Sequence, residues 1–470
     1  MISYIISFNY MYGDFMTKNN NPMGNKKIKS LLFSLAIPAM IANVVNALYN
    51  IVDQIFIGQG IGYLGNAATS VAFPITTICL CIGLVTGLGA SFNFNLDLGR
   101  KNPHRAQKIT GTAVTTLIIS GFILMILVRL FLKDIMIFFG ATKQTLAYSM
   151  EYAGITSFGL PFFLFTTGFN PIVRADGASK YSMFTILIGA ILNIILDPIF
   201  IFIFDMGMAG AAWATVISQI VSALFLANYF RIFKNVKFEK EDFIPKFWAI
   251  KSIVALGFTS LIFQLSTLVI QISMNNLLRF YGASSIYGSD IPIAIVGIVM
   301  KVNILFVSLV LGIVQGAQPI IGFNYGAKKF HRVRETIKVS LIFSTSISLV
   351  IFIIFQAFPR QIISLFGSAS ELYFDYGARF MRFYLAFVFL NGISICITTM
   401  FPAMGKARKG ALLSLIKQVI SLLPLLYILP LFFGLDGIMY ATPIADLISF
   451  ICAVFMLSRE LKIMPKEDLS

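Results

Sequence analysis

Four polar residues within apolar stretches are the first candidates for chemistry in this 470-residue chain. Asp53 lies near the end of the first apolar run, and Thr215 lies in the sixth. Asp197 lies in the fifth run, and Asn193 precedes it by one helical turn on the same face. Carboxylate, amide and hydroxyl oxygens can bind a hard cation such as Na⁺, and two carboxylates that repel each other can instead take up a proton. These residues predict a cation or proton site.

A purely structural role for the two acidic residues is the alternative. Asp53 could cap a helix end, and Asp197, which precedes Pro198, could stabilise a kink. We favour the functional interpretation because ionisable side chains inside a membrane are costly and usually mark a functional site.

The second half of the chain also has charges in its apolar runs. They are Lys301, Arg382, Lys417 and Asp446. A lysine at that depth needs a partner, and Asp446 is the candidate. The charged residues could form ion pairs that hold helices together, or they could line or gate a cavity. Tyr49, in the same run as Asp53, is a further cavity or gating candidate.

The elements that carry these residues must be membrane-spanning helices. The chain is 58% hydrophobic and 12% charged, with mean hydropathy +0.86, whereas soluble chains have roughly 25% charged residues. Runs of about 20 apolar residues cross the bilayer core, and only helices satisfy their backbone groups there. The runs cover residues 31–56, 66–94, 109–132, 148–171, 181–204, 209–230, 253–276, 291–320, 339–358, 371–400, 411–432 and 437–458. We therefore predict an all-α integral membrane protein with twelve transmembrane helices.

The distribution of basic residues predicts the orientation. Most of the 36 lysines and arginines fall in alternate connecting segments, and the other segments have only Lys133, Lys143, Arg279 and Arg360. The positive-inside rule then places both termini in the cytoplasm. The net charge of +16 lies in short loops, so nucleic-acid binding is excluded.

Cysteine and histidine chemistry is not indicated. Cys79, Cys81, Cys396 and Cys452 lie in apolar runs without metal-ligand spacing, and His104 and His331 lie in basic loops. The spans contain no zinc-protease or serine-hydrolase motif, so we expect no enzyme activity, no cofactor and no resident metal beyond a coupling ion. We also expect a monomer in the lipid bilayer.

The chain repeats itself at a shift of 227 residues. Gly89-Ala90 then falls on Gly316-Ala317, and Ala214-Thr215 falls on Ala441-Thr442. Gly99, Lys101 and Gly207 meet Gly326, Lys328 and Gly434. Such glycines serve turns or close helix contacts. Because six is an even number of helices, the two copies enter the membrane in the same sense and form a parallel repeat.

The repeat predicts the domain organisation. We expect a cytoplasmic segment over 1–30, a six-helix lobe over 31–230, a cytoplasmic linker over 231–252, a second lobe over 253–458 and a cytoplasmic tail over 459–470. Two such bundles can rock about a central cavity, so transport is the function that this architecture suits.

Several segments resemble a known family. They are the run from Ala36 through Tyr49 and Asp53 to Gly58, Leu192–Pro198, Gly210–Thr215 and Gln315–Ala327. Together they resemble the multidrug and toxic compound extrusion (MATE) family, closest to the bacterial branch with the DinF and MepA-like exporters. The resemblance covers the chain from about residue 24.

The resemblance implies a V-shaped transporter in a bacterial cell membrane that exports organic, often cationic, compounds in exchange for H⁺ or Na⁺. It assigns the coupling site, including any bound Na⁺, to Asp53, Asn193, Asp197 and Thr215. The acidic residue that another MATE branch has in the seventh helix is not found here, where Gln264 and Gln271 occur. Coupling is therefore expected in the first lobe.

Two other transporter classes remain as alternatives. A major facilitator is suggested faintly by Asp97-Leu-Gly99-Arg100-Lys101 after the second span. A flippase for lipid-linked precursors, from the same superfamily as MATE proteins, is the other. Such flippases often have more helices or a strongly charged cavity.

Overall fold

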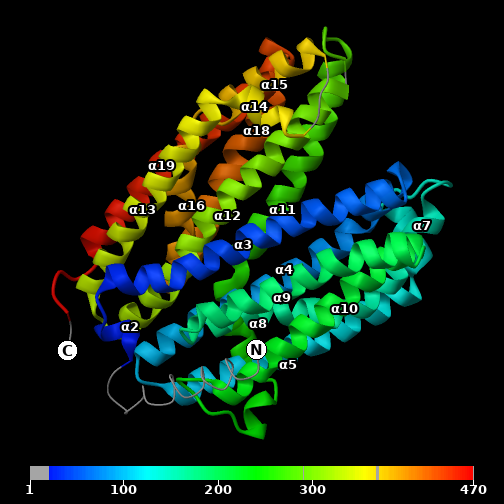
Figure 1. The fold of residues 1–470 in the computed structure, drawn as a ribbon. Coiled ribbons are helices and arrows are strands. Elements are labelled where there is room, and N and C mark those ends of the chain that lie inside the picture. Colours follow the sequence, from blue (N-terminus) through cyan, green and yellow to red (C-terminus); the bar gives the residue numbers. More distant parts are fainter. Residues whose placement is uncertain (1–20, 289, 367–369, 469–470) are drawn as a thin grey trace.

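The computed structural model describes residues 21–288, 290–366 and 370–468, and this part of the chain is helical throughout, without a strand. The first twenty residues of the predicted N-terminal segment lie outside it. We call α3–α10 the first lobe and α11–α19 the second lobe (Figure 1). The predicted all-α class is confirmed, and the predicted domain boundaries stay predictions.

The first lobe is preceded by the single turn α2 (Pro22–Asn25). Its helices are α3 (Ile28–Gly60), α4 (Tyr63–Gly99), α5 (Pro103–Leu130), α6 (Leu132–Phe138), α7 (Leu146–Thr156), α8 (Leu160–Ala175), α9 (Ser179–Pro198) and α10 (Gly207–Ala227). The second lobe has α11 (Phe247–Ala283), α12 (Asp290–Gly326), α13 (Phe330–Ala357), α14 (Pro359–Ser364), α15 (Glu371–Tyr384), α16 (Val388–Ala403), α17 (Ala407–Leu415), α18 (Leu423–Phe433) and α19 (Leu435–Ile463).

Ten helices of the described part are long and apolar enough to cross a membrane, and α15 with α16, bent by 45°, makes an eleventh span. The twelfth predicted span, 148–171, consists of α7 and α8, joined by the 3₁₀ turn η1 (Ser157–Gly159). Neither piece alone has the length of a span. The interruption has a local cause, because Pro161 at the start of α8 has no N–H to donate to the preceding turn.

The outer faces of the helices are apolar, as lipid contact requires. On α5, Phe122, Ile123 and Ile126 are each about half exposed. In water such an exposed apolar surface would be unfavourable, whereas a membrane protein turns it toward lipid.

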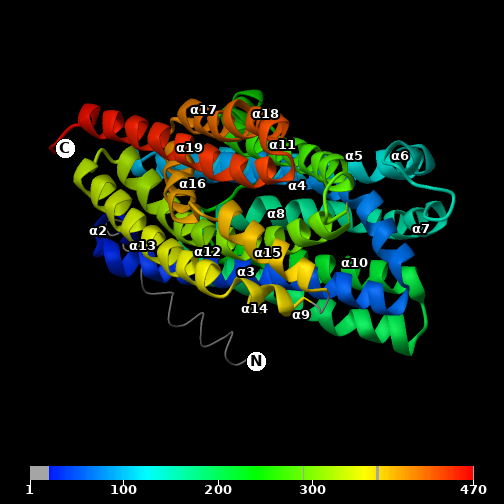
Figure 2. The same ribbon diagram turned by 90° about the horizontal axis from the view of Figure 1, so that it is seen from above.

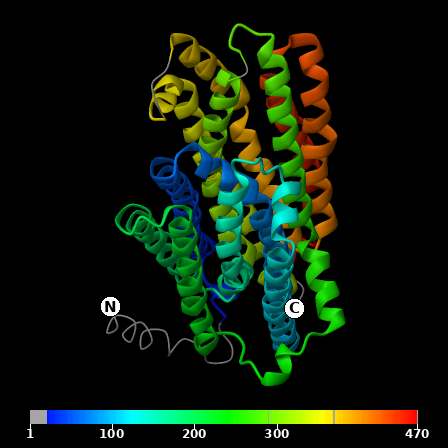
Figure 3. The same ribbon diagram turned by 90° about the vertical axis from the view of Figure 1, so that its right-hand side faces the viewer.

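Both lobes gather many of their connections at one end of the molecule, which we call the terminal end. The linker between the lobes lies there, because Asn21 Nδ2 donates to Asn235 Oδ1 at 3.0 Å. The end of α19 lies there too, since Arg334 near the start of α13 donates to the carbonyl oxygen of Met464. Figure 3 shows the linker and the C-terminal end toward the same side. We call the other end distal.

The lobes meet through two helix pairs, α3 with α12 and α4 with α11 (Figures 1 and 2). Glycines allow the backbones to touch near the terminal end. A Cβ on Gly89 would lie 2.0 Å from the carbonyl oxygen of Ile253, and one on Gly316 would lie 2.6 Å from Ala36 Cα. Gly99, Gly257, Gly312 and Gly326 likewise face the opposite lobe. The terminal end is therefore closed by direct contact between the lobes.

The backbone repeats with the sequence. Lys101 and Lys328, 227 residues apart, both adopt the left-handed conformation, with φ of 59° and 57°. Each lies just after a long helix, where a left-handed residue closes the last turn. Gly207 and Gly434, also related by the shift, have φ of 54° and 55°. The two halves thus share turn geometry as well as helix order.

Candidate functional site

Helix α9 places an amide and a carboxylate together at the core of the first lobe. Asn193 and Asp197 lie one turn apart, and Asn193 Nδ2 donates to Asp197 Oδ1 at 3.2 Å. Both side chains are buried. Pro198 follows at once, and the helix continues as the π turn η2 (Ile199–Ile203). Such π segments are rare and occur frequently at functional sites.

Helix α3 contributes the second carboxylate. The carboxyl groups of Asp53 and Asp197 lie within hydrogen-bond contact of each other. Tyr49, one turn before Asp53, interacts electrostatically with both carboxyl groups. The sequence-predicted acidic pair and Tyr49 are therefore brought together, from helices about 140 residues apart in the chain.

Three oxygens of this cluster have no hydrogen-bond partner within the described residues. They are Asp53 Oδ1, Asn193 Oδ1 and Asp197 Oδ2, and all three are buried. Leaving a buried polar group unpaired costs about 1–3 kcal/mol, and more when the group is charged. Two adjacent carboxylates add repulsion to this cost. A cation or a proton between them would relieve both.

Thr215 on α10 approaches the same cluster. Its hydroxyl donates to the carbonyl oxygen of Ala211 at 3.1 Å, which leaves its lone pairs free to accept. It also interacts with the hydroxyl of Tyr152 on α7, which in turn lies within electrostatic range of Asp53 and Asp197. The sequence analysis missed Tyr152. The only signal was a tyrosine in an apolar run, whose hydroxyl needs a partner when buried.

The second-lobe candidates do not form one group. Lys417 Nζ lies 2.9 Å from Asp446 Oδ1 and also donates to Asn391 Oδ1. Arg382 is exposed on α15, where its Nε donates to the carbonyl oxygen of Gln356 at 3.2 Å. The structure therefore joins Lys417 and Asp446 and leaves Arg382 apart.

Lys301 is exposed on α12 and shares a helix face with residues that contact the first lobe. Ser308 and Gly312 follow it by seven and eleven residues, which is close to whole turns of a helix. The carbonyl oxygen of Ser308 accepts from Asn43 Nδ2, and Gly312 packs on Met40. Lys301 thus lies beyond the contact, on the face of α12 that turns toward the first lobe.

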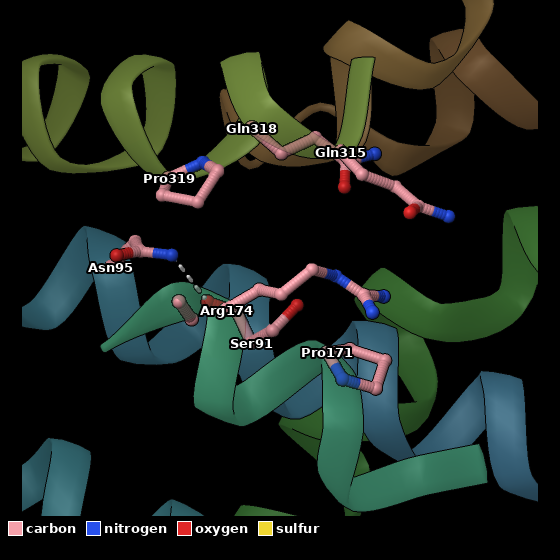
Figure 4. A pocket seen from close by; sticks show the side chains of 8 residues that line it. Ser91, Asn95, Pro171, Arg174, Gln315, Gln318 and Pro319 are labelled. Carbon is pink, nitrogen blue, oxygen red and sulfur yellow. Dashed lines mark hydrogen bonds between the residues drawn. The ribbon is translucent and has the colours of Figure 1, made fainter. Parts of the chain in front are cut away.

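A small pocket lies between the lobes near the terminal end (Figure 4). It is lined by Ser91 and Asn95 of α4, Pro171, Arg174 and Ala175 of α8, and Gln315, Gln318 and Pro319 of α12. The Arg174 guanidinium is buried and donates to Ser182 Oγ at 3.0 Å. The pocket has room for about one water molecule, so the lobes leave no wide passage at this point.

Comparison with known proteins agrees with this architecture. The family model described as MatE matches residues 38–199 and 256–428, one stretch in each lobe. The chain belongs to the MATE family. It is a multi-pass membrane transporter and not an enzyme, and the major facilitator alternative is set aside.

Curated relatives and solved structures extend this result. The multidrug export protein MepA of Staphylococcus aureus (strain N315) is 27% identical over 430 residues, which cover 90% of this chain and 92% of MepA. MepA of Staphylococcus saprophyticus is 26% identical over the same shares. A structure described as the outward-facing conformation of a multidrug resistance MATE family transporter has a TM-score of 0.88 at 22% identity, covering 96% of this chain and 99% of that one. A transporter of the MOP superfamily from Pyrococcus furiosus gives the same score and coverage.

Proposed function

We propose that this MATE transporter exports organic, often cationic, compounds from the cell in exchange for H⁺ or Na⁺ bound between Asp53 and Asp197. The observation that carries the proposal is the group of three buried oxygens without partners, contributed by α3 and α9. The name of MepA, a multidrug export protein, supports the substrate class. The proposed ion is a transported substrate of the protein.

The terminal end is proposed to face the cytoplasm, because most lysines and arginines lie in its connecting segments. In this orientation the closed contact between the lobes lies on the inner side. The likeness to the structure described as outward-facing agrees with it. A coupling ion would reach the first-lobe cluster from the distal, outer side.

The proposed mechanism follows from the charge of the cluster. An incoming cation would neutralise the repulsion between Asp53 and Asp197 and draw α3 toward α9. Such a shift changes the packing of α3 on α12, the helix through which the lobes meet. The ion drives exchange only if its affinity differs between the outward-facing and inward-facing states.

The experiment is dye transport in proteoliposomes that contain the purified chain. A fluorescent cationic dye is followed under a proton gradient alone and under a Na⁺ gradient alone, which identifies the coupling ion. We expect Asp53→Asn and Asp197→Asn to reduce gradient-driven transport to the rate of protein-free vesicles. Asp134→Asn, at an exposed carboxylate on α6, is the matched control and should transport like the wild type. Undiminished transport in both site variants would refute the proposal.

A further inference from the structure

The second lobe contains a buried ion pair whose position in the repeat is informative. Asp446 is almost fully buried, and the side chain of Lys417 is 20% exposed. Lys417 Nζ contacts Asp446 Oδ1 at 2.9 Å and donates to Asn391 Oδ1 from α16. Tyr384 of α15 lies within electrostatic range of Asp446 and hydrogen-bonds with Thr442. The carboxylate is thus held by one ammonium group.

The repeat relates this pair to the first-lobe cluster. Thr442 is the counterpart of Thr215 at the shift of 227 residues, and Asp446 follows Thr442 by one turn on the same face of α19. Lys417 is the counterpart of Ala190, seven residues before Asp197. At 1.5 Å per residue, the pair lies about 6–10 Å nearer the terminal end than the first-lobe cluster.

The residue types also correspond. The first-lobe cluster combines Asp197, Asn193 and Thr215, and the second-lobe group combines Asp446, Asn391 and Thr442. Both contain a carboxylate, an amide and a threonine hydroxyl. Both also use a π turn in the corresponding helix, because Lys417 lies in η5 (Ile416–Leu422) between α17 and α18. The difference is the cation, which the second lobe supplies from its own chain.

We propose that Lys417 is a tethered cation that occupies a second carboxylate site at Asp446, so that only the first lobe exchanges an ion. The inference rests on the proposed function of the first-lobe site. It explains why the acidic residue of the first lobe has no basic partner, whereas the acidic residue of the second lobe does. The ammonium neutralises Asp446 permanently, and no ion from solution is needed there.

The proposal predicts a gain of function when the ammonium is removed. In Lys417→Met, Asp446 would keep its burial and its neighbouring oxygens from Asn391 and Thr442, but it would lose its counter-ion. A buried carboxylate in this state should bind H⁺ or Na⁺ from solution, as the first-lobe cluster does. The variant therefore creates a second exchangeable site.

The test measures thermal unfolding of the purified full chain with Na⁺, with choline and over a pH series. The background is Asp53→Asn/Asp197→Asn, which removes the first-lobe carboxylates. In this background we expect no cation-specific shift of Tm. Adding Lys417→Met should produce a rise of several degrees with Na⁺ or with falling pH, because a ligand that binds only the folded state stabilises it. Further addition of Asp446→Asn should abolish the rise.

The controls separate the outcomes. Lys133→Met, at an exposed lysine on α6, should give no cation response. Lys417→Gln, which keeps a hydrogen-bonding side chain, replaces Lys417→Met if that variant does not fold. A folded Lys417 variant without a cation response would overturn the proposal. A cation response in the background that Asp446→Asn removes would also overturn it, since an ion would then share the site with Lys417. Failure of the proposed function appears elsewhere, as unchanged dye transport in Asp53→Asn and Asp197→Asn.

Discussion

The contact at Gly89 gives the sharpest prediction about conformational change. The outward-facing state that we propose requires the lobes to touch at the terminal end, and export requires them to separate there. In Gly89→Ala the new methyl group would meet the carbonyl oxygen of Ile253 at 2.0 Å. This atom belongs to the backbone of α11 and cannot rotate away. The substitution therefore penalises only the state in which the lobes are in contact.

The magnitude follows from overpacking. Extra methyl groups in a well-packed interior cost about 1–3 kcal/mol. Because a tenfold change in an equilibrium constant corresponds to about 1.4 kcal/mol, the ratio of separated to closed molecules should rise by about 5- to 150-fold. Alanine also forms helix better than glycine by about 1 kcal/mol, which a control must share. Gly297→Ala on α12 is that control, since a Cβ at Gly297 has nothing within 4 Å.

The assay is the rate at which a maleimide labels a cysteine introduced at Gln318, which lines the pocket between the lobes. Native cysteines give little background because Cys79, Cys81 and Cys396 are buried. Gly89→Ala should label faster than the wild type, and Gly297→Ala should not. Equal labelling rates in the two glycine variants would refute the view that this contact closes the transporter.

Three further predictions concern the terminal end and the first-lobe cluster. Asp176 accepts from Tyr229 Oη at 2.6 Å, from Lys234 N at 2.8 Å and from Asn235 Nδ2 at 2.7 Å, so Asp176→Asn turns an amide N–H toward these donors. We expect a loss of about 1–3 kcal/mol, seen as a lower Tm, and little change in the exposed control Asp134→Asn. Arg332 donates to the carbonyl oxygens of Met23 at 3.1 Å and Lys26 at 2.7 Å. Arg332→Gln should speed trypsin cleavage after Lys26 by about tenfold or more, whereas Arg334→Gln, which loses a bond to the C-terminal segment, should not. Tyr152→Phe should weaken the apparent affinity for the coupling ion by about 2- to 10-fold, because one hydroxyl near Thr215 is lost, and an effect no larger than that of Tyr148→Phe would contradict its place in the cluster.

The sequence predicts the helical class well because apolar runs in lipid leave the backbone one option. It predicts less well where a helix is interrupted. The span over 148–171 reads as one apolar run, but Pro161 divides it into α7 and α8. The repeat was visible as glycine coincidences, and the structure gives two of them a physical reason, since Gly89 and Gly316 both touch the opposite lobe.

The candidate site was predictable where charge marked it. Asp53 and Asp197 are rare acidic residues in apolar runs, and they lie together in the structure. Tyr152 was not predictable, because a tyrosine in a membrane helix is ordinary and its neighbours come from other helices. Arg382 shows the converse. A charge in a predicted span marked it, but it lies exposed at the surface, bonded to the backbone of Gln356.

The central claim is that Asp53 and Asp197 bind the ion that is exchanged for the exported compound. The most direct test reverses the exchange: a gradient of the cationic dye across proteoliposomes is used to drive movement of protons or radioactive Na⁺ in the opposite direction. The account predicts dye-driven ion movement with the wild type and none with Asp197→Asn that folds and still binds the dye. Equal ion movement with the wild type and Asp197→Asn would contradict the account.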